Sequence, residues 1–123
     1  MYVKNIKIQI YTGDRNQAQE RHGQGKNEFP NGDVYKGSYS NGKRFGHGFY
    51  KWKNGQRYIG NYSDNVRSGQ GTFIYPDGSR YDGDFSNGKR SGQGKYTYAN
   101  GDYYQGEWDN DKKHGQGDLF KIN

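Results

Sequence analysis

The 123-residue sequence contains no cysteine, only two prolines and few of the aliphatic residues that usually fill a protein core. Leu, Ile, Val and Phe together number only 16, which is a composition more typical of a disordered chain than of an aliphatic core. The absence of cysteine excludes a disulfide framework and a cysteine-ligated zinc site. No apolar run approaches the roughly 18 residues of a transmembrane helix. Any fold must therefore be held together by other side chains.

Glycine and aromatic residues are abundant, and they recur at a fixed period. The chain has 21 glycines, 13 tyrosines, 6 phenylalanines and 2 tryptophans. Successive members of one tyrosine series are 23 residues apart, after a first interval of 24: Tyr11, Tyr35, Tyr58, Tyr81 and Tyr104. Counted from these tyrosines, every glycine falls into one of five positions of the repeat. Disordered glycine would be scattered, so the period predicts a folded repeat.

Each repeat has two segments in which glycine alternates with aromatic residues, separated by turns such as Asn41-Gly42 and Asn87-Gly88. Asn-Gly between alternating segments is a strong signal for a β-hairpin, and this glycine density disfavours helix. We predict an all-β protein, an elongated single-layer antiparallel sheet of about ten strands built from tandem 23-residue β-hairpin repeats. The predicted segments are an N-terminal strand or cap at 1–10, a divergent first repeat at 11–34, and repeats at 35–57, 58–80, 81–103 and 104–123.

The odd period makes a prediction about strand register, because side chains alternate between the two faces of a sheet and one turn must compensate. A two-residue turn at 41–42 predicts three facing pairs, which are Tyr39 with Arg44, Gly37 with Gly46, and Tyr35 with Gly48. A three-residue turn that ends in a left-handed glycine, at 76–78, places Phe73 opposite Tyr81. One face then carries a stripe of aromatic rings laid over glycines, an arrangement that stabilises glycine-rich strands.

The N-terminal segment alternates Ile6, Ile8 and Ile10 with polar residues, a pattern typical of a half-buried strand. We expect this strand to cap the first repeat or to pair with a neighbouring subunit. Lys4 and Lys7 interrupt the segment, so it lacks the continuous apolar stretch of a signal peptide. This favours a location in the cytoplasm.

Two segments, Gly37–Lys43 and Gly83–Lys89, have the spacing of a phosphate-binding loop. The next residue is Arg44 or Arg90 rather than the Ser or Thr that would bind magnesium. Each segment also lies at a predicted hairpin instead of before a helix. A structural turn is therefore the favoured interpretation.

The three histidines, His22, His47 and His114, match no metal-ligand spacing and are interpreted as surface residues. The 13 acidic residues are scattered, and no nucleophile, base and acid come together in the repeat pattern. We predict no catalytic residues, no metal site and no cofactor, and hence a protein that is not an enzyme.

One position of the repeat is basic throughout, occupied by Arg21, Arg44, Arg67, Arg90 and Lys113. The favoured interpretation is structural, with each cation packed on an aromatic ring for about 0.5–1 kcal/mol. The alternative is an electrostatic stripe that binds an acidic protein segment or an acidic phospholipid. Specific binding of nucleic acid is not predicted.

An open single-layer sheet leaves some rings half exposed, and exposed aromatic residues mark protein interfaces. We therefore predict partner contacts at the centre of each repeat, made by four rings and by the basic residues that face them. These residues are Tyr39, Tyr62, Phe85, Trp108, Arg44, Arg67, Arg90 and Lys113.

The unit Tyr81–Gly94 resembles a MORN repeat, and the resemblance extends over about residues 11–120. Within that family, residues 20–33, 51–55 and 72–81 are similar to the radial spoke head 1 homologues of motile cilia. The resemblance implies a non-enzymatic scaffold of the axoneme, located in the cytoskeleton of the cilium or flagellum. It also implies contacts with other radial spoke head proteins and with the central apparatus. Self-association is a further expectation.

Overall fold

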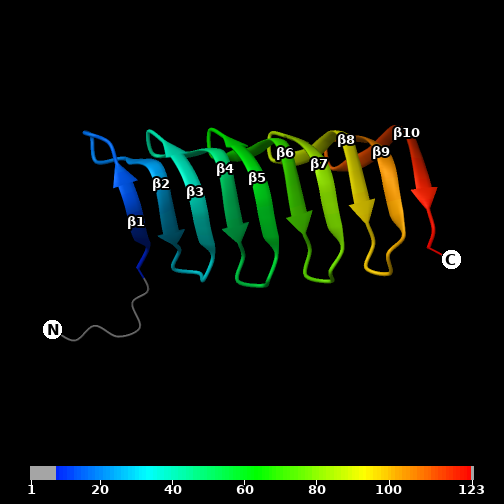
Figure 1. The fold of residues 1–123 in the computed structure, drawn as a ribbon, viewed down its shortest axis with the longest axis horizontal. Helices are drawn as coiled ribbons and strands as arrows, with labels where there is room; N and C mark the ends of the chain where they lie inside the picture. Colours follow the sequence, from blue (N-terminus) through cyan, green and yellow to red (C-terminus); the bar gives the residue numbers. More distant parts are fainter. Residues whose placement is uncertain (1–7, 123) are drawn as a thin grey trace.

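Figure 1 shows the computed structural model, which describes residues 8–122, as one open, elongated sheet. All ten strands are antiparallel to their neighbours, and their order in the sheet is their order in the chain. The described residues form no helix, and so none that could cross a membrane. The predicted fold class is confirmed. The strands are β1 (Ile10–Arg15), β2 (Arg21–Glu28), β3 (Val34–Ser40), β4 (Lys43–Lys51), β5 (Arg57–Ser63), β6 (Val66–Ile74), β7 (Arg80–Ser86), β8 (Lys89–Thr97), β9 (Tyr103–Asp109) and β10 (Lys112–Phe120).

Two kinds of turn alternate along the sheet. Within the second repeat, Asn41 and Gly42 have φ of 48° and 85°, the double left-handed geometry of a type I′ hairpin. Between repeats, Tyr75 donates its backbone N–H to the carbonyl of Ser79 at 2.9 Å, and Gly78 has φ of 90°. This three-residue turn with a left-handed glycine compensates the odd period as predicted, and Phe73 faces Tyr81.

The register inside each hairpin differs from the prediction beyond the first pair. Tyr39 faces Arg44 as expected, but Gly37 faces Gly48 and Tyr35 faces Tyr50. The predicted pairs with Gly46 and Gly48 were wrong because β4 contains two extra residues in a bulge, where Gly46 has φ of 83°. Two extra residues leave every later side chain on its original face, and a bulge bends the strand. In Figure 1 the strand ends along the upper edge curve back behind the sheet.

The core lies on one face, which we call the inner face, and consists of aromatic rings over glycine backbone. The Tyr35 hydroxyl donates to the carbonyl of Ser38 at 2.9 Å, and its ring crosses Gly48 on the neighbouring strand. A Cβ at Gly48 would collide with that ring. A hydrogen bond from the hydroxyl to the backbone carbonyl three residues later also forms in the other four tyrosines of the series: Tyr11, Tyr58, Tyr81 and Tyr104.

The rings also join each repeat to the next. Tyr35 makes an edge contact with Tyr62 of the following repeat, with the ring centroids 5.4 Å apart. Tyr58 contacts Phe85, and Tyr81 contacts Trp108, each at 5.2 Å. The core is therefore a continuous line of edge-to-face rings along the sheet rather than a closed cluster.

The first repeat is less complete than the others. Its residue opposite Tyr35 is Asn27, whereas the corresponding residues in the next three repeats are aromatic. Asn27 is fully buried, and its amide has no hydrogen-bond partner among residues 8–122. The prediction of a half-buried N-terminal strand was wrong for Ile8, which precedes β1 and is 66% exposed, and for Ile10, which begins β1 and is 47% exposed. Ile6 lies outside the described residues.

Candidate partner-binding groove

Two adjoining hollows lie on the inner face of the sheet, one repeat apart. One, of about 270 Å³, is lined by Arg44, Tyr50, Trp52, Tyr62, Asn65, Val66, Arg67 and Gly88. The other, of about 280 Å³, is lined by Gln9, Arg21, Phe29, Tyr39, Gly42, Arg44, Tyr50 and Asn65. Moving the second set along by 23 residues reproduces most of the first. We call the two hollows together the inner groove.

An arginine forms the wall between the two hollows and ties one repeat to the next. The Arg44 guanidinium donates from Nη2 to the Asn65 carbonyl at 2.9 Å and from Nε to the Asn65 side-chain oxygen at 3.3 Å. Arg67 and Arg90 reach the next turn in the same way, binding the carbonyls of Gly88 and Asp111. We call this contact the arginine clasp.

The clasp arginines also pack on aromatic rings, which supports the structural interpretation of the basic column. Arg44 lies over three rings at 5.2–5.7 Å from their centroids, those of Tyr35, Tyr50 and Tyr62. Its backbone faces Tyr39, as predicted, but its guanidinium leans toward the following repeat. Arg67 and Arg90 each lie over three rings as well.

The last basic residue of the column differs from the arginines. Lys113 is exposed on β10, with its ammonium 4.9 Å from the centroid of Tyr104 and 5.2 Å from that of Tyr98. It keeps the cation–aromatic contact, but no further turn stands beside it among the described residues. The basic column therefore continues to the end of the sheet, while the arginine clasp stops at Arg90.

The four rings predicted to contact a partner lie in the core. Tyr39, Tyr62, Phe85 and Trp108 are each about 5% exposed, and Trp108 donates its indole N–H to the Gly94 carbonyl. Little of their surface can reach a second molecule. Partner contact by the eight predicted residues stays a prediction. Among them, the clasp arginines are more accessible than the four rings.

The accessible aromatic surface is a different set of rings, which the sequence analysis missed. These rings are half-buried against the core at the ends of the even-numbered strands, and they include Tyr50, Trp52, Tyr75 and Tyr96. Tyr50 and Trp52 line the inner groove. The sequence signal for these rings is that aromatic residues recur 15 and 17 residues after the series tyrosine. Both positions lie on the core face, but they lie beyond the glycines that the core rings cover, and so their rings stay partly exposed.

The repeat is matched by a known family model. The model described as MORN repeat matches residues 20–34, 35–57, 58–80, 81–103 and 104–120. The chain belongs to the MORN-repeat family. The four matches from residue 35 onward each contain a series tyrosine and a glycine pair of the ring-over-glycine core, and the match at 20–34 contains Gly23 and Gly25 without Tyr11.

Two curated relatives share part of this MORN array. Residue identity is 64% over 31 residues with the radial spoke head 1 homolog of Cyprinus carpio, and 62% over 29 residues with that of Mus musculus. The matches cover 25% and 24% of this chain, but only 14% and 10% of the relatives. The chain therefore spans a small part of the proteins it matches.

Burial sets the protonation of the tyrosines that line the groove of the MORN array. It raises the pKa of Tyr62 to about 12, and burial together with the Asp33 carboxylate raises the pKa of Tyr50. The Tyr50 hydroxyl donates to Asp33 at 2.8 Å, and Asp33 also accepts the backbone N–H of Lys53 at 2.9 Å. A phenol is neutral at physiological pH, and the raised pKa values keep both hydroxyls protonated further into the alkaline range.

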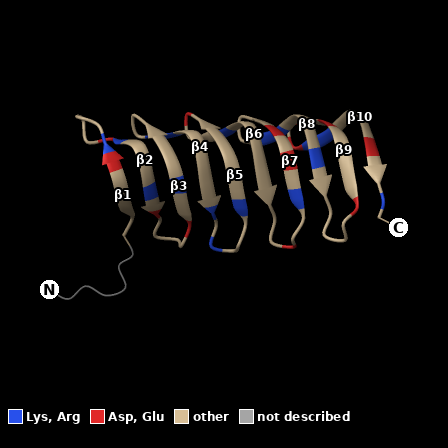
Figure 2. Ribbon diagram, in the orientation of Figure 1, with Lys and Arg blue, Asp and Glu red and all other residues tan. Residues whose placement is uncertain are grey.

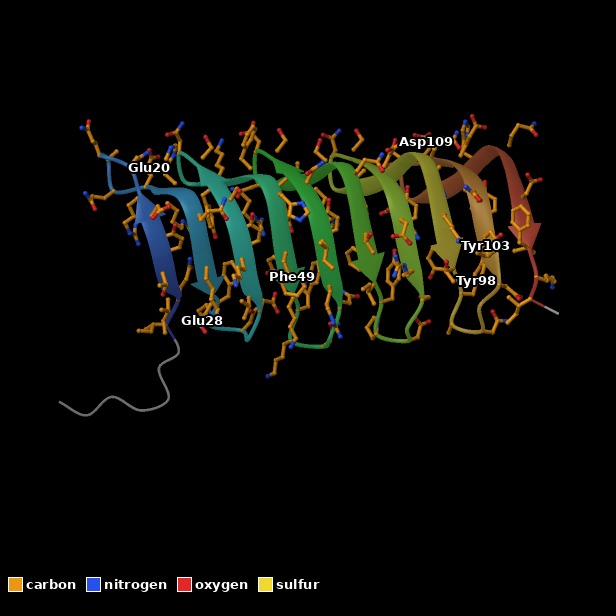
Figure 3. The ribbon with its side chains drawn as sticks, viewed as in Figure 1. Glu20, Glu28, Phe49, Tyr98, Tyr103 and Asp109 are labelled. Carbon is orange, nitrogen blue, oxygen red and sulfur yellow. The ribbon has the colours of Figure 1, made fainter. Side chains whose placement is uncertain are left out.

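The opposite, outer face of the MORN sheet is mostly polar. Figure 2 shows both signs of charge spread along the sheet instead of being segregated to its two ends. Arg80 and Thr72 both bind Asp82, and these hydrogen bonds outweigh burial, so that the pKa of Asp82 lies below its usual value. Phe49 and Tyr103, labelled in Figure 3, are aromatic residues of this face. Among residues 8–122, no group of three or more His, Asp or Glu side chains could hold a metal ion.

Proposed function

We propose that this MORN-repeat chain is a non-enzymatic scaffold of the ciliary axoneme, and that it works in a radial spoke head by binding other spoke-head proteins. The support is the combination of a tandem repeat array with partial similarity to the radial spoke head 1 homologs. A repeat sheet of this kind offers a long surface on which the same contact can be made several times.

The inner groove is the proposed contact surface, and the observation that carries this is the repetition of one hollow at successive units. Successive hollows are two strands apart, or about 10 Å at ~4.8 Å per strand. A segment in the extended polyproline II conformation rises about 3.1 Å per residue with three residues per turn, so every third residue would face the sheet and reach the next hollow. The proposed ligand is an extended partner segment that runs along the sheet.

The side chains that line the groove indicate which residues a partner segment should carry. The clasp uses the Nε–H and one Nη2–H of Arg44, and a guanidinium carries five N–H donors. The remaining donors suit a carboxylate, and the half-buried rings of Tyr50 and Trp52 suit an apolar or aromatic side chain. We therefore expect a partner segment with acidic residues at about every third position.

The test follows a tagged chain in ciliated cells and the proteins that co-purify with it from isolated axonemes. Asn65→Asp places a negative charge in both hollows, at the repeat position where Asp111 binds Arg90, and should abolish the recovery of spoke-head proteins. Asn61→Asp, the same change at an exposed position of the outer face, is the matched control and should retain it.

Localisation and partner recovery separate the two parts of the proposal. A tagged chain located away from cilia would refute the axonemal role. Loss of partners in Asn61→Asp with retention in Asn65→Asp would place the contact on the outer face instead.

Binding to acidic phospholipid is the second candidate. The observation in its favour is that Lys43, Lys89 and Lys112 are exposed directly after three of the hairpin turns on one side of the sheet. The test is flotation with phosphatidylserine vesicles. Changing these three lysines to Gln should reduce binding, whereas changing Lys26 and Lys36, which lie within strands away from these turns, should not; no flotation of the unaltered chain would reject the idea.

A further inference from the structure

Exposed apolar side chains gather at the two open edges of the sheet. The described residues include eight large hydrophobic residues that are exposed, and five of them lie at or beside the first or the last strand. Those at the β1 edge are Ile8 and Ile10, and those at the β10 edge are Leu119, Phe120 and Ile122. An edge strand carries unpaired backbone N–H and C=O groups that can pair with another strand.

Successive repeats pair in one fixed register, and we call each such pair of strands a joint. The register of the joints predicts how a further strand would pair with either edge of the sheet. In the joint between β2 and β3, Gly25 faces Gly37 and Glu28 faces Val34. The joints at β4–β5, β6–β7 and β8–β9 also place a glycine opposite a glycine. In the β8–β9 joint, Tyr96 faces Tyr104, two residues from the glycine pair.

The two outer edges carry the two halves of this same joint. On β10, Gly117 and Leu119 occupy the positions that Gly94 and Tyr96 occupy on β8. On β1, Tyr11 and Gly13 occupy the positions of Tyr35 and Gly37 on β3. Because the sheet has an even number of strands, β10 of one copy and β1 of another would be antiparallel, as every neighbouring pair in the sheet is.

We propose that copies of this chain associate head to tail, with β10 of one copy pairing with β1 of the next in the register of the internal joints. That register sets Gly117 opposite Gly13 and brings three apolar residues of β10 and its continuation against the head of the next copy. The facing pairs are Leu119 with Tyr11, Phe120 with Ile10, and Ile122 with Ile8. The joint covers all five of the edge hydrophobic residues.

A symmetric contact between two β10 strands accounts for less of the structure. With Gly117 opposite its own copy, Leu119 would face Gly115 instead of an apolar side chain. Ile8 and Ile10 would remain exposed. The head-to-tail joint is therefore the arrangement that covers more of the exposed apolar side chains at the two edges.

The joint is weaker than the internal ones, because Arg15 stands at the β1 position that Tyr39 occupies on β3. One ring of the core line is missing there, so copies should separate on dilution. A head-to-tail contact leaves a free head and a free tail after each addition, and so it builds open chains rather than closed dimers.

Sedimentation velocity of the 123-residue chain over a range of concentrations tests the proposal. The head variant carries Ile8→Lys and Ile10→Lys, and the tail variant carries Phe120→Lys and Ile122→Lys. The control carries two lysines at exposed positions away from both edges, Ser63→Lys and Gln105→Lys. Circular dichroism and thermal unfolding verify that each variant folds.

The unaltered chain and the control should gain mass as concentration rises, while the head variant and the tail variant should each stay single chains. An equimolar mixture of the head and tail variants should form a species of two chains that does not grow, because one intact tail meets one intact head. An unaltered chain that stays single at all concentrations would overturn the proposal. Self-association of the head variant alone would replace it with the symmetric β10 contact, and self-association of the tail variant alone would indicate a β1 contact.

Discussion

The middle repeats and the first repeat follow one sequence pattern but are held differently. Tyr58 in the middle is fully buried between rings of its own and the next repeat, whereas Tyr11 in the first repeat is half-buried beside an open edge. The first repeat also has Asn27 where the later ones have a ring. The difference teaches that the stability of a repeat in this sheet comes from its neighbours more than from its own residues.

Alkaline unfolding should show the largest effect, because burial raises the pKa of several core tyrosines at once, Tyr35, Tyr58 and Tyr81 as well as Tyr62. Burial raises the pKa of Tyr62 to about 12 from its usual 10, so this phenol is protonated in the folded chain at a pH where the unfolded chain has lost the proton. The contribution of Tyr62 is complete below pH 10 and is lost as pH rises toward 12, at about 2 kcal/mol. We expect cooperative unfolding in this window, measured by tryptophan fluorescence. Tyr62→Phe should move the midpoint upward more than Tyr11→Phe does; equal shifts would contradict the comparison.

Filling a glycine should cost more in the middle than at the edge. A Cβ at Gly71 would collide with the Tyr58 ring, and a Cβ at Gly25 would collide with the Tyr11 ring. Tyr58 is packed on both sides and cannot move, whereas Tyr11 can swing toward solvent. Gly71→Ala should lower the free energy of unfolding by about 3 kcal/mol and Gly25→Ala by about 1 kcal/mol. Urea unfolding measures both, and equal losses would show that the edge ring is as fixed as the central one.

Removing a clasp should also distinguish the regions. Arg67 lies over three rings and donates to the Gly88 carbonyl, whereas Arg21 lies over Tyr39 alone. Arg67→Ala should cost about 2 kcal/mol and Arg21→Ala about 0.5 kcal/mol in urea unfolding. Arg67→Lys should recover only part of the loss, since an ammonium cannot span both contacts. Full recovery of stability in Arg67→Lys would show that the clasp requires only a positive charge and not the guanidinium geometry.

The smallest expected effect is a gain. Asn27→Phe gives the first repeat the ring that Phe73 supplies to the third, and it removes a buried amide that has no hydrogen-bond partner within residues 8–122. We expect about 1 kcal/mol of stabilisation in urea unfolding. Phe73→Asn is the reciprocal variant and should destabilise by more than that. A destabilising Asn27→Phe would show that the first repeat has packed around the smaller side chain.

Much of the fold could be predicted from the sequence because its repeat is strict. The strands, both kinds of turn, and the pairs Tyr39–Arg44 and Phe73–Tyr81 follow from the spacing of tyrosine, glycine and Asn-Gly. The two-residue bulge at Gly46 could not be predicted in this way, because inserting two residues leaves the alternation of faces unchanged.

The candidate site was harder to predict than the fold. Tyr39 and Tyr50 both lie on the inner face, and the period does not say that Tyr39 is covered by neighbouring rings while Tyr50 stays half exposed. The reach of Arg44 to the turn of the next repeat depends on the bend in the strands, which is set by the bulge. Ile8 and Ile10 alternate like a buried strand, but no second layer in the described part of the chain covers them.

The strand order carries a mechanical consequence. In an antiparallel sheet the backbone hydrogen bonds run perpendicular to the strands, so here they run along the long axis of the molecule. A tensile load applied between β1 and β10 would meet these bonds in series, one strand boundary after another. The protein would then extend in steps of one strand, the weakest boundary first, and would act as a compliant link rather than a rigid strut.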